Sequence, residues 1–118
     1  MKEALAAMTK LLEKTGLPVY AEGQVPPEAV PPLVTFNWTP VPYPDKGTCA
    51  VTAYFPEENG HDCRAGFAVR LNVAVPRAGA LEKAGDGWLW VRRGTAEQAD
   101  DNGTPVLRAK LGVLWQKE

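Results

Sequence analysis

The sequence has one histidine, two cysteines, no surplus of either charge and no long apolar run. The formal net charge is -1 and the pI is about 5.9, so the chain lacks the excess of Lys and Arg that draws proteins onto nucleic acid. No stretch of about 18 apolar residues could span a membrane, and charged residues interrupt the first sixteen, where a signal peptide would be apolar. These absences argue against a general nucleic-acid binder, a membrane protein and an exported protein.

Histidine chemistry would have to pass through His61, because a Ser/His/Asp triad and a Cys/His dyad both need an imidazole. Asp62 and Cys63 follow it directly. Neighbouring side chains diverge on both helices and strands, whereas chelation and proton relay need convergent ones. We therefore expect an exposed histidine at a helix start, with no catalytic and no metal-binding role.

Other reactive groups give equally little support for catalysis. Glu57 with Glu58, and Asp100 with Asp101, are paired carboxylates in segments predicted as polar loops, where nothing would raise a pKa. Cys49 and the second cysteine lack a CxxC spacing, and two thiols in an unexported chain are usually reduced and buried. We predict no enzymatic activity and no cofactor.

The 118 residues form one domain, 1–118, with 45% hydrophobic and 23% charged residues, as in ordinary globular proteins. Residues 2–15 repeat apolar side chains at helical spacing and are followed by Gly16 and Pro18, which predicts an amphipathic helix. A short strand is expected within 17–23. The proline-rich residues 24–32 then predict a stiff surface loop.

Alternating apolar and polar residues predict further strands. The segments 33–38 and 48–55 are expected to pair as antiparallel neighbours, each with one face on a core. The segments 87–94 and 104–118 predict a hairpin whose long loop is the polar stretch 95–103.

Residues 59–76 fit two structures. Apolar residues alternate from Cys63 to Val75, as in a strand. Asn59 is also a good helix N-cap, and Pro76 would stop a helix. One helical stripe would hold Cys63, Phe67, Leu71 and Ala74. The residues alone leave this choice open.

The stretch GWLWVRRG, residues 87–94, raises the central functional question. Trp88 and Trp90 share one side of a strand, which would suit an aromatic and basic platform for a ligand. Leu89 and Val91 between them are also apolar, and this favours a strand buried on both faces. We expect the buried arrangement, with Arg92 and the arginine after it emerging as interface residues.

Two longer stretches carry a family resemblance. LLEKTGLPVYAEGQVPPEAVPPLVTFNW resembles the start of small tail-completion or tail-terminator proteins of long-tailed bacteriophages and prophages, with Leu33 where those proteins commonly have tyrosine. GWLWVRRG, the acidic segment and the last strand resemble the second half of that family. The quoted residues make turns and packing contacts, so none of them is diagnostic of a chemistry.

The resemblance implies an α+β fold, with a mostly antiparallel β-sheet and two α-helices packed on it, and therefore a helix near 60–74. It also implies a virion protein, assembled in the host bacterial cytoplasm, that forms a ring, commonly of six copies. The ring would cap the tail tube protein and meet a head-completion protein, without membrane or sequence-specific nucleic-acid partners.

Reciprocal polar contacts in such a ring are expected from the segments 23–32 and 94–104. The candidate subunit or tail interface residues are Arg92, Arg93, Asp100 and Asp101. Two alternatives stay open: another head-tail connector or neck protein, and a small cytosolic ligand-binding module that uses the tryptophan face.

Overall fold

A computed structural model describes residues 2–41 and 43–117. Its helices and strands follow in the order α1 (Lys2–Glu13), β1 (Val19–Ala21), β2 (Leu33–Asn37), β3 (Gly47–Tyr54), α2 (Gly60–Ala74), β4 (Ala80–Ala84), β5 (Gly87–Asp101) and β6 (Thr104–Lys117). The predicted α+β class, with two helices on a mostly antiparallel sheet, is confirmed. The last residue of the predicted strand 104–118 lies outside the described residues.

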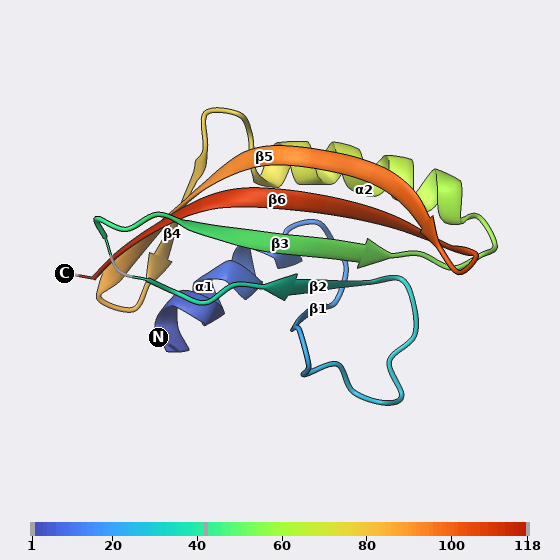
Figure 1. The fold of residues 1–118 in the computed structure, drawn as a ribbon, viewed down its shortest axis with the longest axis horizontal. Coiled ribbons are helices and arrows are strands. Elements are labelled where there is room, and N and C mark those ends of the chain that lie inside the picture. The colour runs from blue at the N-terminus through green and yellow to red at the C-terminus, as the bar shows by residue number, and fades with distance from the viewer. Residues whose placement is uncertain (1, 42, 118) are drawn as a thin grey trace.

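The six strands form one sheet in the order β1-β2-β3-β6-β5-β4. Only β1 and β2 pair in parallel, and the expected antiparallel pairing of β2 with β3 is present. Figure 1 shows the long β5–β6 hairpin running along the molecule, with α2 beside β5. The start of α1 and the end of β6 lie at the end of the molecule opposite the hairpin turn (Figure 1).

One face of the sheet, called the inner face here, carries the hydrophobic core. Side chains alternate along a strand, so every second residue points to this face. Both helices contribute to the same core cluster as these inward residues, which means that both cover the inner face. Its fully buried large side chains include Phe55, Phe67, Met8, Leu11, Leu12, Leu71, Leu89 and Leu111.

Helix α1 buries an apolar stripe, as predicted, and ends at Glu13, two residues before the predicted end. Gly16, just beyond it, has a φ of 89°, a backbone conformation that glycine adopts without steric cost. Lys14 forms an ion pair with Glu82 of β4, a buried carboxylate whose side chain is 7% exposed. Arg70 of α2 donates a hydrogen bond to the carbonyl oxygen of Thr15, so the end of α1 is tied to both α2 and the sheet.

Helix α2 settles the ambiguous segment in favour of a helix. Phe67 and Leu71 are buried, and the Phe67 ring meets Phe55 edge to face at a centroid distance of 5.7 Å. Val69 and Val73, which the strand pattern would place with the core, are 63% and 78% exposed. Asn59 occupies the N-cap position with a φ of 60°, but its side chain makes no capping hydrogen bond, contrary to the sequence prediction.

The predicted polar loop 95–103 is wrong. Strand β5 continues to Asp101, and only Asn102 and Gly103, with φ values of 52° and 86°, form the turn to β6. Two positive φ angles are typical of the tight turns that match the twist of a hairpin. The segment is polar because much of it faces solvent, which a loop prediction based on composition cannot distinguish from an exposed strand.

Strand β4 was not predicted from the sequence. Its residues, ALEKA, are poor strand formers, and its central Glu82 faces the core rather than solvent. The strand exists because it pairs with residues 87–91 of β5 and because Lys14 neutralises the buried carboxylate.

Phe67→Ala should lower the free energy of unfolding by about 3–4 kcal/mol, since it removes a fully buried ring and leaves a cavity between α2 and the sheet. Val73→Ala on the same helix is the control, and it should change stability by less than about 0.5 kcal/mol because Val73 is exposed. Urea unfolding followed by circular dichroism measures both. Equal effects would show that α2 does not pack through Phe67.

Gly103→Ala should destabilise the protein by roughly 1–2 kcal/mol, because alanine is strained at a positive φ. Gly112→Ala in the middle of β6 is the matched control, since a Cβ there would meet nothing closer than 4.0 Å and the backbone is not left-handed. Thermal unfolding distinguishes the two variants. A Gly103→Ala variant as stable as the wild type would argue against the tight turn and for the long loop.

Candidate functional site

The candidate site lies on the outer face of the sheet, the face turned away from both helices. Cross-strand partners share a face, so the ladders show which residues line it. Trp90 pairs with Leu114 of β6 and with Leu81 of β4, while Arg92 pairs with Gly112, which in turn pairs with Thr48 of β3. No described helix covers these positions.

The prediction that residues 87–94 form a doubly covered strand is wrong. Leu89 and Val91 point into the core and are fully buried, as expected. Trp88 is 39% exposed and Trp90 is half-buried, because the layer needed to cover their face is missing. An uninterrupted apolar run fits both a strand buried on two sides and a strand that presents aromatic rings at a surface.

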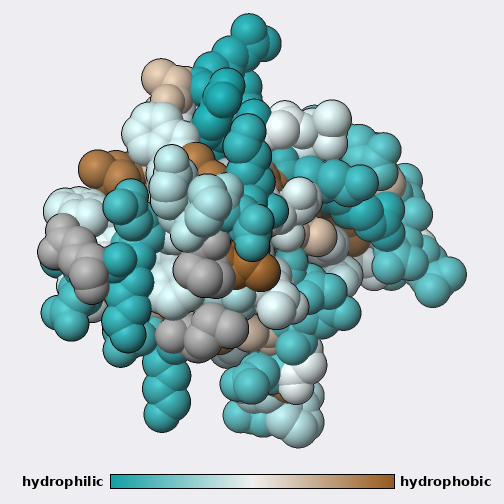
Figure 2. All heavy atoms as spheres, turned by 60° about the vertical axis from the view of Figure 1, so that its left-hand side comes forward, coloured by the Kyte–Doolittle hydropathy of each residue, from teal (hydrophilic) through white to brown (hydrophobic). Residues whose placement is uncertain are grey.

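Leu81, Trp88, Trp90 and Leu114 form an apolar patch on the outer face, called the tryptophan patch below. Leu81 is 54% exposed, and the ammonium of Lys83 lies 4.7 Å from the centre of the Trp88 ring, which favours a cation–π contact. Figure 2 shows that apolar groups in this view are scattered among hydrophilic side chains rather than forming one broad apolar face. Lys83 therefore places a positive charge at the border of the patch.

A groove with a volume of about 420 Å³ adjoins the tryptophan patch. It is called the outer groove here, and its lining residues are Lys46, Gly47, Thr48, Trp90, Arg92, Arg93, Gly94, Gly112, Val113 and Leu114. Lys46 and Arg92 bring positive charge to it, whereas Arg93 borders it near its backbone, and none of the described lining residues is acidic. The glycines make the groove deeper, because they have no side chain above the backbone.

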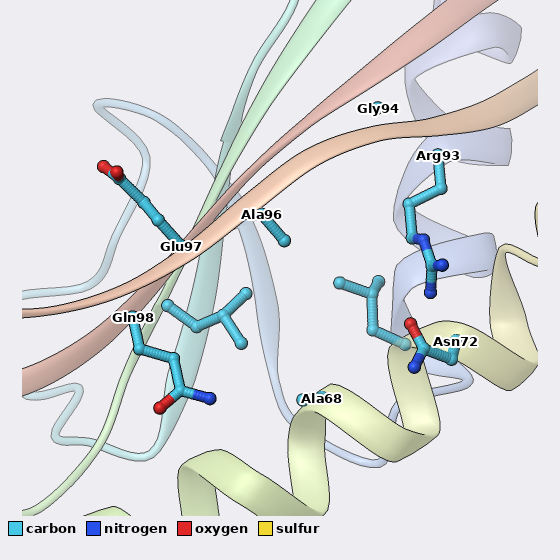
Figure 3. A pocket seen from close by; sticks show the side chains of 9 residues that line it. Ala68, Asn72, Arg93, Gly94, Ala96, Glu97 and Gln98 are labelled. Carbon is cyan, nitrogen blue, oxygen red and sulfur yellow. The ribbon is translucent and has the colours of Figure 1, made fainter.

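Arg92 and Arg93 do not act as a pair. Arg92 is exposed and lies on the outer face, whereas Arg93 is half-buried and extends toward Asn72 of α2 (Figure 3). It borders a separate pocket of about 320 Å³ between α2 and β5, together with Ala68 and Gln98. Consecutive strand residues face opposite sides, so the sequence pair is divided between two surfaces.

A β-bulge between Arg93 and Ala96 then changes which residues of β5 face inward. Before the bulge, Leu89 and Val91 point to the core. After it, Ala96 lies opposite the buried Ala109 and points toward α2 (Figure 3).

Asp100 and Asp101 lie at the hairpin turn, also on opposite faces. Asp100 Oδ1 is 3.6 Å from Arg64 Nη1 of α2, and Asp101 Oδ2 is 3.7 Å from Arg108 Nη2 on the outer face. Both distances exceed those of a good hydrogen bond, and the two carboxylate side chains are 62% and 48% exposed. These ion pairs leave the acids available to solvent.

More carboxylates gather at this end of the molecule, called the acidic end below. Its members are Glu57, Glu58, Asp62, Asp100 and Asp101, all exposed. Glu57 comes from the β3–α2 connection and reaches the turn, because a Cβ on Gly103 would lie 3.6 Å from its Oε1. Both carboxylate pairs are evident in the sequence, but the cluster is not, since three chain segments build it.

His61 is exposed at the start of α2, as predicted, and its Nδ1 lies 2.9 Å from Arg64 Nη2. The prediction of two buried thiols holds for Cys49 only. Burial raises the pKa of the Cys49 thiol to about 12, so it stays protonated at neutral pH. Cys63 is exposed, although it lies four residues before the buried Phe67 on the same side of α2, so the predicted stripe is buried only from Phe67 onward.

Among residues 2–41 and 43–117, no group of three or more His, Cys, Asp and Glu side chains is arranged to hold a metal ion. Neither described helix combines the length and the apolar character needed to cross a membrane.

Comparison with known proteins identifies the fold without a function. No family model matches the chain. No curated protein matches it at a significant level. One solved structure superposes with a TM-score of 0.69 at 14% sequence identity, over 99% of this chain and 94% of that chain. At this identity the likeness concerns the fold alone.

Trp88 and Trp90 should account for the fluorescence that acrylamide quenches, because Trp38 and Trp115 are 7% and 6% exposed. Trp88→Phe should remove the larger part of the quenchable emission, and Trp115→Phe, the matched control, should leave it unchanged. Stern–Volmer analysis of the three proteins tests this. A wild-type protein that resists quenching would mean that another part of the chain, or another copy, covers the patch.

Proposed function

We propose that the protein is a non-enzymatic structural protein of a bacteriophage or prophage, which caps the tail tube and helps to join tail to head. The sequence resemblance to tail-completion proteins supplies this assignment. The structure is compatible with it through one observation: the outer groove is basic, while the far end of the same hairpin is acidic.

A closed ring needs two different, complementary patches on each subunit, because the contact surface of one copy meets another surface on the next. Opposite charge at separated places is what such a head-to-tail contact requires. A two-fold dimer could place the same two patches against each other twice, so the assembled mass distinguishes it from a ring. The charge distribution is compatible with the ring that we propose as the working assembly.

A ring on a tail must also present surfaces to the tube protein and to a head-completion protein. The connector between β1 and β2 offers one, since Val25 and Val30 are 37% and 74% exposed. The tryptophan patch offers another, because exposed apolar groups rimmed by charge are typical of protein interaction sites. Neither surface belongs to the hydrophobic core, so both can bind partners while the domain stays folded.

A second candidate function is a ligand-binding module that uses the tryptophan face. The exposed Trp88 and the outer groove favour it, because aromatic rings beside cations suit an anionic aromatic ligand. The groove is open along the sheet rather than closed around a ligand, and we therefore rank this function second. A different neck protein is separated from a terminator only by the assembly intermediate that accumulates in its absence.

Electron microscopy of particles from a phage or induced prophage that lacks this gene tests the proposal. We expect overlong or headless tails beside filled heads, because nothing would stop tube growth or bind the head. Expression of the wild-type protein from a plasmid is the control and should restore normal particles. Normal, infectious particles without the gene would reject a tail function and favour the ligand-binding module.

A further inference from the structure

We infer that the acidic end of one copy docks in the outer groove of the next copy, and that this contact propagates the assembly head to tail. The inference rests on the proposed ring for its biological setting. It goes further by naming the two surfaces, their orientation and the residue of the Arg92–Arg93 pair that takes part.

The groove has the properties of an acceptor. Lys46 reaches it from the loop before β3 and Arg92 from the middle of β5, while Trp90 forms an apolar wall. Its described lining contains no carboxylate that would neutralise these cations. Gly112 lies opposite both Arg92 and Thr48, so a neighbouring chain could approach the backbone of the sheet closely.

The acidic end has the properties of a matching ligand. The β5–β6 turn is only two residues long, and it projects a narrow tip with Asp100 and Asp101 just before it. Glu57 and Glu58 add charge beside the tip, and neither forms an ion pair within the described chain. The five carboxylates of the acidic end outnumber the two arginines that pair with its aspartates, Arg64 and Arg108, so the tip keeps an excess of negative charge.

These two surfaces cannot meet within one molecule. Arg92 and Asp101 belong to the same strand and are separated by nine residues, or roughly 30 Å at the rise of an extended chain. The acidic end of one copy can therefore satisfy only the groove of another copy. A subunit that has docked through its tip alone still has a free groove, which allows the contact to repeat until a ring closes.

The two neighbouring arginines are expected to differ. Arg92 lies on the outer face with the groove, whereas the Arg93 side chain extends toward α2 on the inner face (Figure 3). Only the first can reach a carboxylate that enters from the outer side. This asymmetry provides a control at the adjacent residue.

The test uses purified full-length protein with two charge-reversed variants. The groove variant carries Lys46→Glu and Arg92→Glu, and the tip variant carries Asp100→Lys and Asp101→Lys. Like charges would then face each other in each homogeneous sample, so each variant should associate at least about tenfold more weakly than wild type. An equimolar mixture should regain association, because each altered surface finds an opposite charge and each unaltered surface keeps one.

Sedimentation velocity at low and high ionic strength measures the assembled mass. We expect species larger than dimers in wild type and in the mixture, and fewer of them at high salt, because screening weakens exposed charge pairs. Arg93→Glu should associate like wild type. Glu57→Lys with Glu58→Lys provides a second tip variant that leaves the ion pairs of Arg64 and Arg108 intact, and circular dichroism confirms that each variant is folded.

The docking would be overturned if the mixture failed to regain association, or if Arg93→Glu lost as much association as the groove variant. Assembly that stops at dimers would overturn its head-to-tail form, and a wild type that stays monomeric at millimolar concentration would overturn it entirely. None of these results depends on the phage experiment. If the mixture regains association but particles that lack the gene are normal, the docking contact is supported and only the tail function is rejected.

Discussion

The β5–β6 hairpin is the element on which the rest of the structure depends. β6 lies between β3 and β5, so the central ladder links the two halves of the sheet, and its inward residues form the floor on which both helices pack. The same hairpin extends to a two-residue turn at one end of the molecule and carries the outer groove in its middle. Core formation and the two charged surfaces are therefore built by one continuous pair of strands.

Much of this fold could be predicted from the sequence, because periodicity reports directly which side of an element meets the core. Helix α1, the β2–β3 pair and the start of β5 were predicted for that reason. The polar half of β5 was missed since a strand that faces solvent has no apolar alternation, and its hydrogen bonds to β6 depend on residues that follow in the chain. β4 was missed because its stability comes from pairing with β5 and from the Lys14–Glu82 ion pair, which joins residues 68 positions apart.

The candidate site was less predictable, because faces are assigned by the complete sheet. Arg92 and Arg93 are neighbours in sequence but belong to different surfaces, and the bulge after them shifts the facing of the acidic half of the strand. Lys46 and Gly112 gave no signal of their own, since a loop lysine and a strand glycine become parts of a groove only when β3, β5 and β6 are side by side. The burial of the tryptophans could not be judged from local pattern either, as it depends on whether a second layer exists.

That missing layer connects the fold to the proposed assembly role. The helices cover one face of the sheet and complete the hydrophobic core. The open face leaves Trp88 and its apolar neighbours in contact with water. This contact has a free-energy cost that a partner surface would remove. Charge then restricts the orientation in which another copy can approach, because the carboxylates at one end attract the cations in the groove. The apolar patch thus supplies a reason to associate and the charge separation supplies the direction. A protein that must add to copies of itself in one order needs both.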